Sequence, residues 1–461
     1  MMTTTRSPRR IAWALALSCG LSVAQSPDSS QESPRLDRLV AVAKLWAAVK
    51  YFHPYLAYRD DIDWDAALVK AIPKVNAAKT PADYSAAVAG MLAELGDPAS
   101  RILEATDLKS ADPSVANEKH PFSGMTADNI LVVDLTNYSD FLDYVGTREK
   151  ISALKKEIPK AQAIVFDLRP SSPPTEDEQG SAAASISMSG IAGMLTASPV
   201  LGPGERRRMH VGYAPQDGRT SGDYSSGFYT QGQQAIRPAS DAKDIPVVFL
   251  LSPHADLPEM ALSFQAAGKS AIVVEGEADD SLAVTTEVVH LTDNVRAQIR
   301  LGELVYEDGT GGFAPNLKVA PSSLGGEQNP ALQAALQLAR SGKFAPPNRA
   351  RLSERTSPSR DKNYEDMEYP PPEYRVLAAF RLWAVIDYFF PYKEFMGEDW
   401  DGVLRDFIPR LEQAKDALDY NLTLSEMVTH IHDSHGFIRS PYRSCRKESQ
   451  FCGRYIAFLG G

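Results

Sequence analysis

The chain has 461 residues, of which 43% are hydrophobic and 23% charged, the composition of an ordinary soluble globular protein with two to four domains. Its formal net charge at pH 7 is −11. Nucleic-acid binding depends on clustered lysine and arginine, so we expect no nucleic-acid partner.

The first 24 residues have the pattern of an export signal. Arg6, Arg9 and Arg10 precede the apolar run 11–24, which ends in small residues and is too short to span a bilayer as a mature helix. We predict that residues 1–24 are a signal peptide and that the mature chain is periplasmic or secreted. A lipoprotein anchored through Cys19 is the alternative. Losing this segment removes three arginines and no acids, which lowers the net charge from −11 to −14.

Residues 35–104 are predicted to form a small helical unit. Apolar residues at helical spacing predict three helices, over residues 36–51, 64–75 and 81–95. Aromatic residues at such spacing belong to a helix core, so Trp46 is expected to be structural. No arrangement of charged residues suited to catalysis occurs in this unit.

From residue 125 to residue 322 the pattern changes to that of an α/β domain. Short runs of β-branched and aromatic residues predict buried parallel strands at 129–135, 163–168, 247–251 and 271–276. The intervening stretches are long enough for crossover helices at 141–158, 180–196 and 258–267. Later runs predict an antiparallel extension at 288–291, 298–301 and 304–306. The Gly/Ser/Tyr-rich stretch 212–234 predicts a long loop.

Residues 323–369 are predicted to be a linker that carries one helix, at 330–341. A second helical unit is predicted at 370–438, followed by a tail at 439–461. In an oxidising compartment the tail residues Cys445 and Cys452 can close a small disulfide loop, and two free thiols are the alternative.

The second helical unit repeats the first. Residues 45–55 have the sequence LWAAVKYFHPY and residues 382–392 have LWAVIDYFFPY, with seven of eleven letters identical at an offset of 337. The motif IDWD at 62–65 returns as EDWD at 398–401, at an offset of 336. So long a period indicates a duplicated unit rather than a solenoid.

The order of these motifs resembles the tail-specific, or C-terminal-processing, serine peptidases and their tricorn-core-like relatives. The resemblance is carried by KYFHPY followed by WD, by FDLR at 166–169 and by DGTGGFAPN at 308–316, and it covers roughly residues 36–319 before restarting at 374. It implies an α/β fold, with a small helical domain, then a ClpP/crotonase-like peptidase domain, then a repeat of the helical domain. It also implies peptide-bond hydrolysis without a cofactor, acting on a peptide or an unstructured protein C-terminus.

Asp256 occupies the position that the resemblance gives to the nucleophilic serine, three residues before Glu259. A serine peptidase needs a hydroxyl nucleophile and a base that takes its proton. The D-x-x-E spacing instead predicts that Asp256 caps the helix at 258–267, with Glu259 as the other half of a capping box.

The other parts of the expected site are also missing. The turn at 277–282, where the resemblance places a lysine base, has the sequence EADDSL. The turn at 170–174 after FDLR has three prolines in place of glycines, and proline has no N–H to donate. We therefore predict an inactive site. By resemblance, Asp167 and Arg169 at the end of the FDLR strand are candidate substrate-binding residues.

Two other groups of residues are candidate sites. Ser252 and His254 lie beside Asp256, but alternate residues at one strand end are poorly placed for a nucleophile–base pair. The stretch HIHDSH at 430–435 resembles a metal-binding signature in which two letters are exchanged, and histidines at a helix C-terminus are the simpler explanation. We therefore predict no metal.

Three hypotheses remain open. The first is a tail-specific peptidase relative whose own catalytic site is inactive. The second is a non-catalytic peptide-binding or scaffold protein. The third is part of a longer tandem peptidase with its active site downstream of residue 461.

Overall fold

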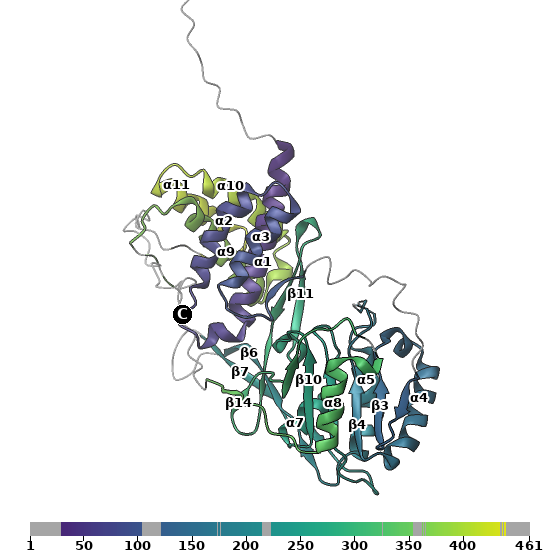
Figure 1. The fold of residues 1–461 in the computed structure, drawn as a ribbon. Coiled ribbons are helices and arrows are strands. Elements are labelled where there is room, and N and C mark those ends of the chain that lie inside the picture. The colour runs from purple at the N-terminus through teal and green to yellow at the C-terminus, as the bar shows by residue number, and fades with distance from the viewer. Residues whose placement is uncertain are drawn as a thin grey trace, which may run out of the picture.

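The computed structural model describes residues 29–103, 121–213, 223–353 and 362–438, apart from residues 173, 176, 325, 363, 365, 434, 435 and 437. The predicted signal peptide at 1–24, Cys445 and Cys452 lie outside the described residues. The two copies of the helical unit lie together at one end of the molecule, and the α/β domain lies at the other (Figure 1). Among the described residues, no helix is both long enough and apolar enough to cross a membrane.

A six-stranded sheet forms the centre of the α/β domain. Its order is β15-β10-β9-β4-β3-β2, and every neighbouring pair is parallel except β2 with β3. The strands are β2 Ser123–Met125, β3 Ile130–Asp134, β4 Ala163–Asp167, β9 Val247–Leu251, β10 Ser270–Glu275 and β15 Leu317–Val319. The four predicted parallel strands are confirmed. Both faces of β4 and β9 are buried, which explains their unbroken apolar sequences.

Helices cover both faces of this sheet. One face carries a core shared with α4 Tyr144–Glu157, α5 Ser181–Met188, α6 Ile191–Met194 and α7 Glu259–Ala266. The other face is covered by α8 Pro330–Ser341. The predicted helix at 330–341 is therefore confirmed, but it packs on the sheet. The packed α/β layer thus extends into the segment that was expected to be a linker.

Antiparallel strands connect the two ends of the molecule. The sheets are β13-β6-β7 and β1-β12-β11. Their strands are β1 Arg101–Leu103, β6 Gly204–Tyr213, β7 Asp223–Gln231, β11 Thr286–His290, β12 Arg296–Arg300 and β13 Gly302–Val305. The predicted antiparallel extension is confirmed. The predicted long loop at 212–234 is wrong over β7, because pairing with β6 makes a strand of a Ser/Tyr-rich segment that has little apolar pattern of its own.

The remaining elements are short. Two pairs of strands are β5 Val200–Leu201 with β8 Ala235–Ile236, and β14 Thr310–Gly311 with β16 Ala350–Arg351. The 3-10 helices are η1 Pro54–Ala57, η3 Tyr138–Leu142, η4 Ile158–Lys160, η5 Asp280–Leu282, η6 Thr292–Asn294, η7 Gly326–Gln328 and η8 Lys393–Phe395.

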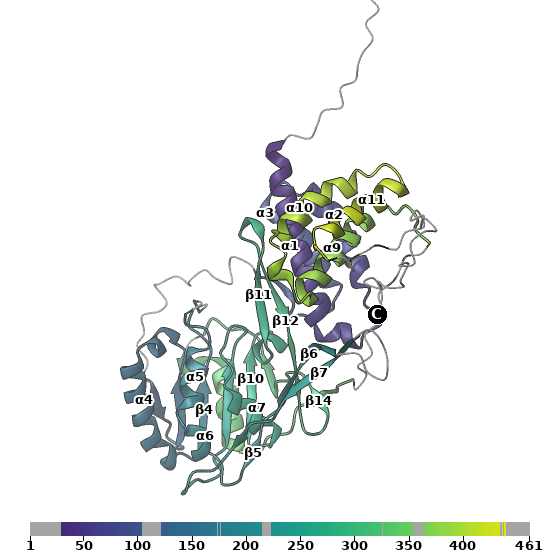
Figure 2. The same ribbon diagram turned by 180° about the vertical axis from the view of Figure 1, so that it is seen from behind.

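The two copies of the helical unit share a single hydrophobic core, which we call the helical body. The first copy contributes α1 Ser29–Phe52, α2 Trp64–Ala77 and α3 Pro81–Ala93, and the second contributes α9 Pro372–Phe389, α10 Trp400–Glu412 and α11 Ala417–Thr429. Figure 2 shows helices of both copies gathered beside the upper part of β11. The duplicated tryptophans have duplicated roles. The indole of Trp64 donates to the carbonyl of Trp46 at 2.9 Å, and that of Trp400 donates to the carbonyl of Trp383 at 3.0 Å.

The interface between the copies is reciprocal. Lys44 and Arg381 occupy equivalent positions, as do Asp65 and Asp401. Lys44 forms an ion pair with Asp401, and Arg381 forms the matching pair with Asp65. In an isologous interface, residue i of one unit contacts residue j of the other and the reverse also holds. The chain therefore contains an internal pseudo-dimer.

Equivalent residues also meet one another, as they do at a two-fold axis. Asn76 donates to its counterpart Glu412 at 3.1 Å. The rings of the counterparts Tyr51 and Tyr388 have centroids 5.4 Å apart. Tyr51 also packs against Phe389 at 4.8 Å, and the reciprocal contact joins Phe52 to Tyr388 at 5.4 Å.

Candidate functional site

Asp256 lies in the turn between β9 and α7, and its carboxylate accepts hydrogen bonds from the start of another helix. Oδ1 accepts from the Gly180 amide at 2.9 Å and Oδ2 from the Ala182 amide at 3.3 Å. Gly180 has φ 77°, a left-handed conformation that glycine adopts without strain. Asp256 therefore caps α5.

The predicted capping box with Glu259 is wrong. The N-cap of α7 is Pro258, which makes no side-chain capping bond, and Glu259 is exposed in the first turn. A proline forces the residue before it into an extended conformation, so the helix cannot begin at Asp256. The carboxylate is instead free to reach α5.

The side chain of Tyr138 fixes the backbone of Asp256. Its backbone N–H donates to the Tyr138 hydroxyl at 2.6 Å, and that hydroxyl donates to the Leu168 carbonyl at 2.6 Å. Burial raises the pKa of the Asp256 carboxyl, and the hydrogen bonds from the amides of α5, Gly180 first, oppose that shift. The position expected for a nucleophile is thus occupied by a fixed hydrogen-bond acceptor.

Among the described residues, no basic side chain forms a hydrogen bond or ion pair with Asp256. Ser252 is half-buried and His254 is exposed, and within the described part of the chain no hydrogen bond joins them. In the turn expected to carry a lysine, Asp280 accepts from Arg300 Nη1 at 2.9 Å and from the Phe313 amide at 2.7 Å. That turn anchors β12 and the DGTGGFAPN segment.

Asp167 and Arg169 belong to a closed polar network. Arg169 donates through Nε and Nη2 to the two oxygens of Asp167, at 2.9 and 2.6 Å. Its Nη1 bonds to Glu275 and, at 2.9 Å, to Asn329, the residue that caps α8. The guanidinium therefore joins β4, β10 and α8. Substrate binding by these two residues stays a prediction.

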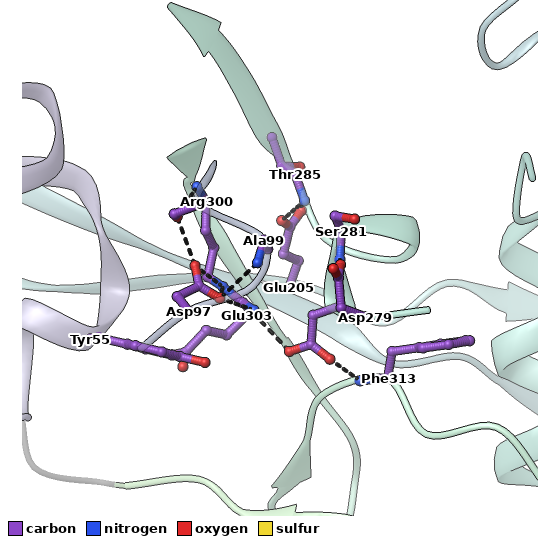
Figure 3. A network of polar contacts seen from close by, with 12 residues as sticks. Tyr55, Asp97, Ala99, Glu205, Asp279, Ser281, Thr285, Arg300, Glu303 and Phe313 are labelled. Carbon is purple, nitrogen blue, oxygen red and sulfur yellow. Dashed lines mark hydrogen bonds and ion pairs between the residues drawn. The ribbon is translucent and has the colours of Figure 1, made fainter. Parts of the chain in front are cut away.

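A buried polar cluster that no sequence motif predicted lies where the helical body meets the α/β domain. Asp97 accepts from His53 Nε2 at 3.0 Å, from the Ser100 hydroxyl at 2.7 Å and from Arg300 Nη2 at 2.7 Å. Figure 3 shows Asp97 facing Arg300, with the ring of Tyr55 beside them. Two sequence signals existed for this cluster: an arginine within the strand predicted at 298–301, and a histidine between the end of α1 and Pro54.

The cluster contains the residue types of a serine-hydrolase triad, but it cannot work as one. His53 Nδ1 accepts from the Tyr55 amide at 3.2 Å, so the ring proton lies on Nε2, which faces both Asp97 and Ser100. A base must present a lone pair to the hydroxyl, and this nitrogen presents a proton. His53 and the Asp97 side chain are also fully buried, which excludes a substrate.

Burial and ion pairing have opposing effects on the pKa values in this cluster, and the pKa values of both His53 and Asp97 are lowered. Burial lowers the pKa of His53 and outweighs the opposing effect of Asp97. Burial alone would raise the pKa of Asp97, but hydrogen bonds from His53 and Arg300 hold it well below its usual value. The cluster is therefore a neutral histidine beside a buried Asp97–Arg300 ion pair, and it joins the two ends of the molecule.

The histidines after α11 do not assemble a metal site in the described part of the chain. His430 Nδ1 and His432 Nε2 lie 3.3 and 3.2 Å from Glu398 Oε1, and His435 lies outside the described residues. No group of three or more His, Cys, Asp or Glu among the described residues is arranged to hold a metal ion.

No family model and no curated protein matches this chain. Several solved structures are similar to part of this chain. A lipoprotein from Streptococcus agalactiae has 14% identity over 70% of this chain and 99% of its own, with a TM-score of 0.37. Mature CPAF has 9% identity over 62% and 93%, with a TM-score of 0.38. The photosystem II D1 C-terminal processing protease has 13% identity over 68% and 98%, with a TM-score of 0.31.

Proposed function

We propose that this chain is an exported, non-catalytic relative of the tail-specific serine peptidases that binds a peptide or protein segment without cleaving it. The observation that carries the proposal is the Asp256 carboxylate bound to the amides of Gly180 and Ala182. The proposal has two parts, the loss of hydrolysis and the retention of binding.

The loss of hydrolysis follows from charge and geometry. Acyl transfer creates an oxyanion, which needs N–H donors pointing at an empty position. Here the amides that begin α5, beside the nucleophile position, already bind a carboxylate. A second negative charge there would be repelled, and Asp256 supplies no hydroxyl to be acylated.

Labelling and turnover test this part. The mature chain, residues 25–461, is incubated with unstructured peptides and with a serine-reactive fluorophosphonate. We expect neither cleavage nor labelling, for the native chain and for Asp256→Ala alike. Labelling that persists in Asp256→Ala and disappears in Ser252→Ala would show a working nucleophile and would overturn the proposal.

A tandem peptidase with its active site downstream is the second candidate, and one feature of the second copy favours it. Tyr55 and Tyr58 of the first copy pack against Arg300 and Arg206 of the α/β domain. Their counterparts Tyr392 and Phe395 are 63% and 83% exposed. A second α/β domain would cover such aromatic residues.

The coding sequence beyond residue 461 decides between these candidates. A downstream FDLR strand followed by an S-x-x-E helix start would support the tandem peptidase. A downstream sequence that has neither motif would refute it. Export is tested separately: N-terminal sequencing of the secreted fraction is expected to begin near residue 25.

A further inference from the structure

The second helical unit contains an open cavity of about 550 Å³. Trp383, Trp400 and Tyr388 supply its aromatic lining, and Lys44 of α1 also lines it. The remaining lining is mostly acidic. Five carboxylates and two lysines line the cavity: Asp387, Glu394, Glu398, Asp399 and Asp401, with Lys44 and Lys393. Because five acidic and only two basic side chains line the cavity, it favours a cationic ligand.

The pseudo-equivalent position in the first copy is filled by a segment of the chain itself. Lys362 forms an ion pair with Asp63, and its carbonyl accepts from Arg381 Nη1 at 2.8 Å. The ring of Tyr364 lies 5.2 Å from the Arg381 guanidinium. Tyr364 has φ 50°, a strained conformation for a tyrosine, which indicates that these contacts hold the backbone in place.

The groups that hold this segment recur in the second copy. Asp399 is the counterpart of Asp63, and Lys44 is the counterpart of Arg381. Lys44 has three donors, so an ammonium that pairs with Asp401 can still donate to a peptide carbonyl. The open cavity therefore keeps a carboxylate for a lysine and a donor for the backbone.

The two reciprocal ion pairs differ in exposure, as expected if the segment with Lys362 and Tyr364 covers only the pair in the first copy. Where Lys362 and Tyr364 are present, the side chains of Arg381 and Asp65 are 5% and 8% exposed. The equivalent side chains of Lys44 and Asp401 are 45% and 42% exposed. The same pair is thus buried in one copy and open in the other.

We propose that the open cavity binds an extended segment of a partner protein that carries a lysine or arginine followed, two residues later, by an aromatic residue. The cationic side chain pairs with Asp399, Lys44 donates to the segment's backbone, and the aromatic ring packs over Lys44. This copies the internal contacts of Lys362 and Tyr364. The inference is independent of whether Asp256 abolishes hydrolysis.

The second cavity selects a more basic segment than the one held in the first copy. Glu398 replaces Ile62, which adds a carboxylate to the wall. Asp387 replaces Lys50, although it is paired with Lys393. A ligand with additional basic residues around the lysine is therefore favoured over one with acidic neighbours.

Fluorescence anisotropy tests this with the mature full-length chain and a labelled peptide of sequence Gly-Arg-Lys-Asn-Tyr-Arg-Gly. We expect saturable binding that weakens about threefold in Asp399→Asn and about tenfold in Asp399→Lys, since exposed ion pairs contribute about 0.2–1 kcal/mol and charge reversal adds repulsion. Glu149→Lys makes the same charge change on exposed α4 and is expected to bind like the native chain. Peptides with glutamate for lysine, or alanine for tyrosine, are expected to bind more weakly.

Three results would overturn the proposal. One is absence of binding to the native chain, and another is equal weakening by Asp399→Lys and Glu149→Lys, which would mean a non-specific charge effect. The third is a dimer of the native chain, seen by sedimentation, that Asp399→Lys dissociates. In that case the cavity would be filled by a second copy of this chain rather than by another protein.

Discussion

Replacing Asp65 by asparagine should destabilise the helical body far more than the same change at Asp401. The two aspartates are equivalent by the internal repeat, and each pairs with the equivalent base of the other copy. Asp65 is far more buried than Asp401, and Lys50 Nζ lies 3.8 Å from its Oδ1, where the second copy has Asp387 instead. Asp401→Asn is therefore the control at the equivalent, exposed position.

The magnitudes follow from that difference. Breaking a buried ion pair by removing one partner costs about 3–5 kcal/mol, because the remaining charge is left without compensation. An exposed pair contributes only about 0–1 kcal/mol. With side-chain exposures of 8% for Asp65 and 42% for Asp401, the two variants should differ by about 3 kcal/mol.

Tryptophan fluorescence during urea unfolding measures this difference selectively. Once residues 1–24 are removed, the remaining tryptophans are those of the helical body: Trp46, Trp64, Trp383 and Trp400. The midpoint should fall strongly for Asp65→Asn and hardly at all for Asp401→Asn, with similar slopes. Equal shifts for the two variants would refute the assignment of one pair as buried and the other as open.

Asp97→Asn should cost about 3 kcal/mol of unfolding free energy, the lower end of the range for breaking a buried ion pair, because Arg300 keeps only its ion pair with the half-buried Asp280. Lowered folded-state pKa values make His53 and Asp97 contribute stability that is complete at high pH. That stability should fall as the pH drops below about 6.5 for His53 and then below about 3.9 for Asp97. Urea midpoints measured across pH 3–8 check this, and stability that rises on acidification would contradict it. Asp256→Ala should cost about 0.5–2 kcal/mol, the usual effect of removing a helix cap, because amides of α5 such as that of Gly180 lose their acceptor. A calorimetric melting temperature equal to that of the native chain would exclude this capping role.

The local pattern of the sequence was enough to predict many elements. Val247–Leu251 has an unbroken β-branched and apolar run, so a buried strand follows from those letters alone. The helix at Pro330–Ser341 was predicted with the bounds the structure has. The tryptophan pairs marked the repeat because Trp64 and Trp400 each donate the same hydrogen bond within their own copy.

Contacts between segments far apart in the sequence could not be predicted from its local pattern. A D-x-x-E spacing predicted that Asp256 caps its own helix, but a carboxylate can bind any amide within reach, and the fold brings Gly180 within 2.9 Å. Similarly, β7 is a strand because β6 lies beside it, and its own residues carry little strand signal.

The sequence by itself determined that the chain has a duplicated helical unit and an α/β domain without a serine nucleophile at the expected position. Periodicity and residue chemistry are local, so they can be read from neighbouring letters. The tertiary structure alone decided that the copies pair with each other, that Arg300 meets Asp97, and that one copy's cavity is filled while the other is open. Each of these depends on which segments, far apart in sequence, come together when the apolar faces are buried.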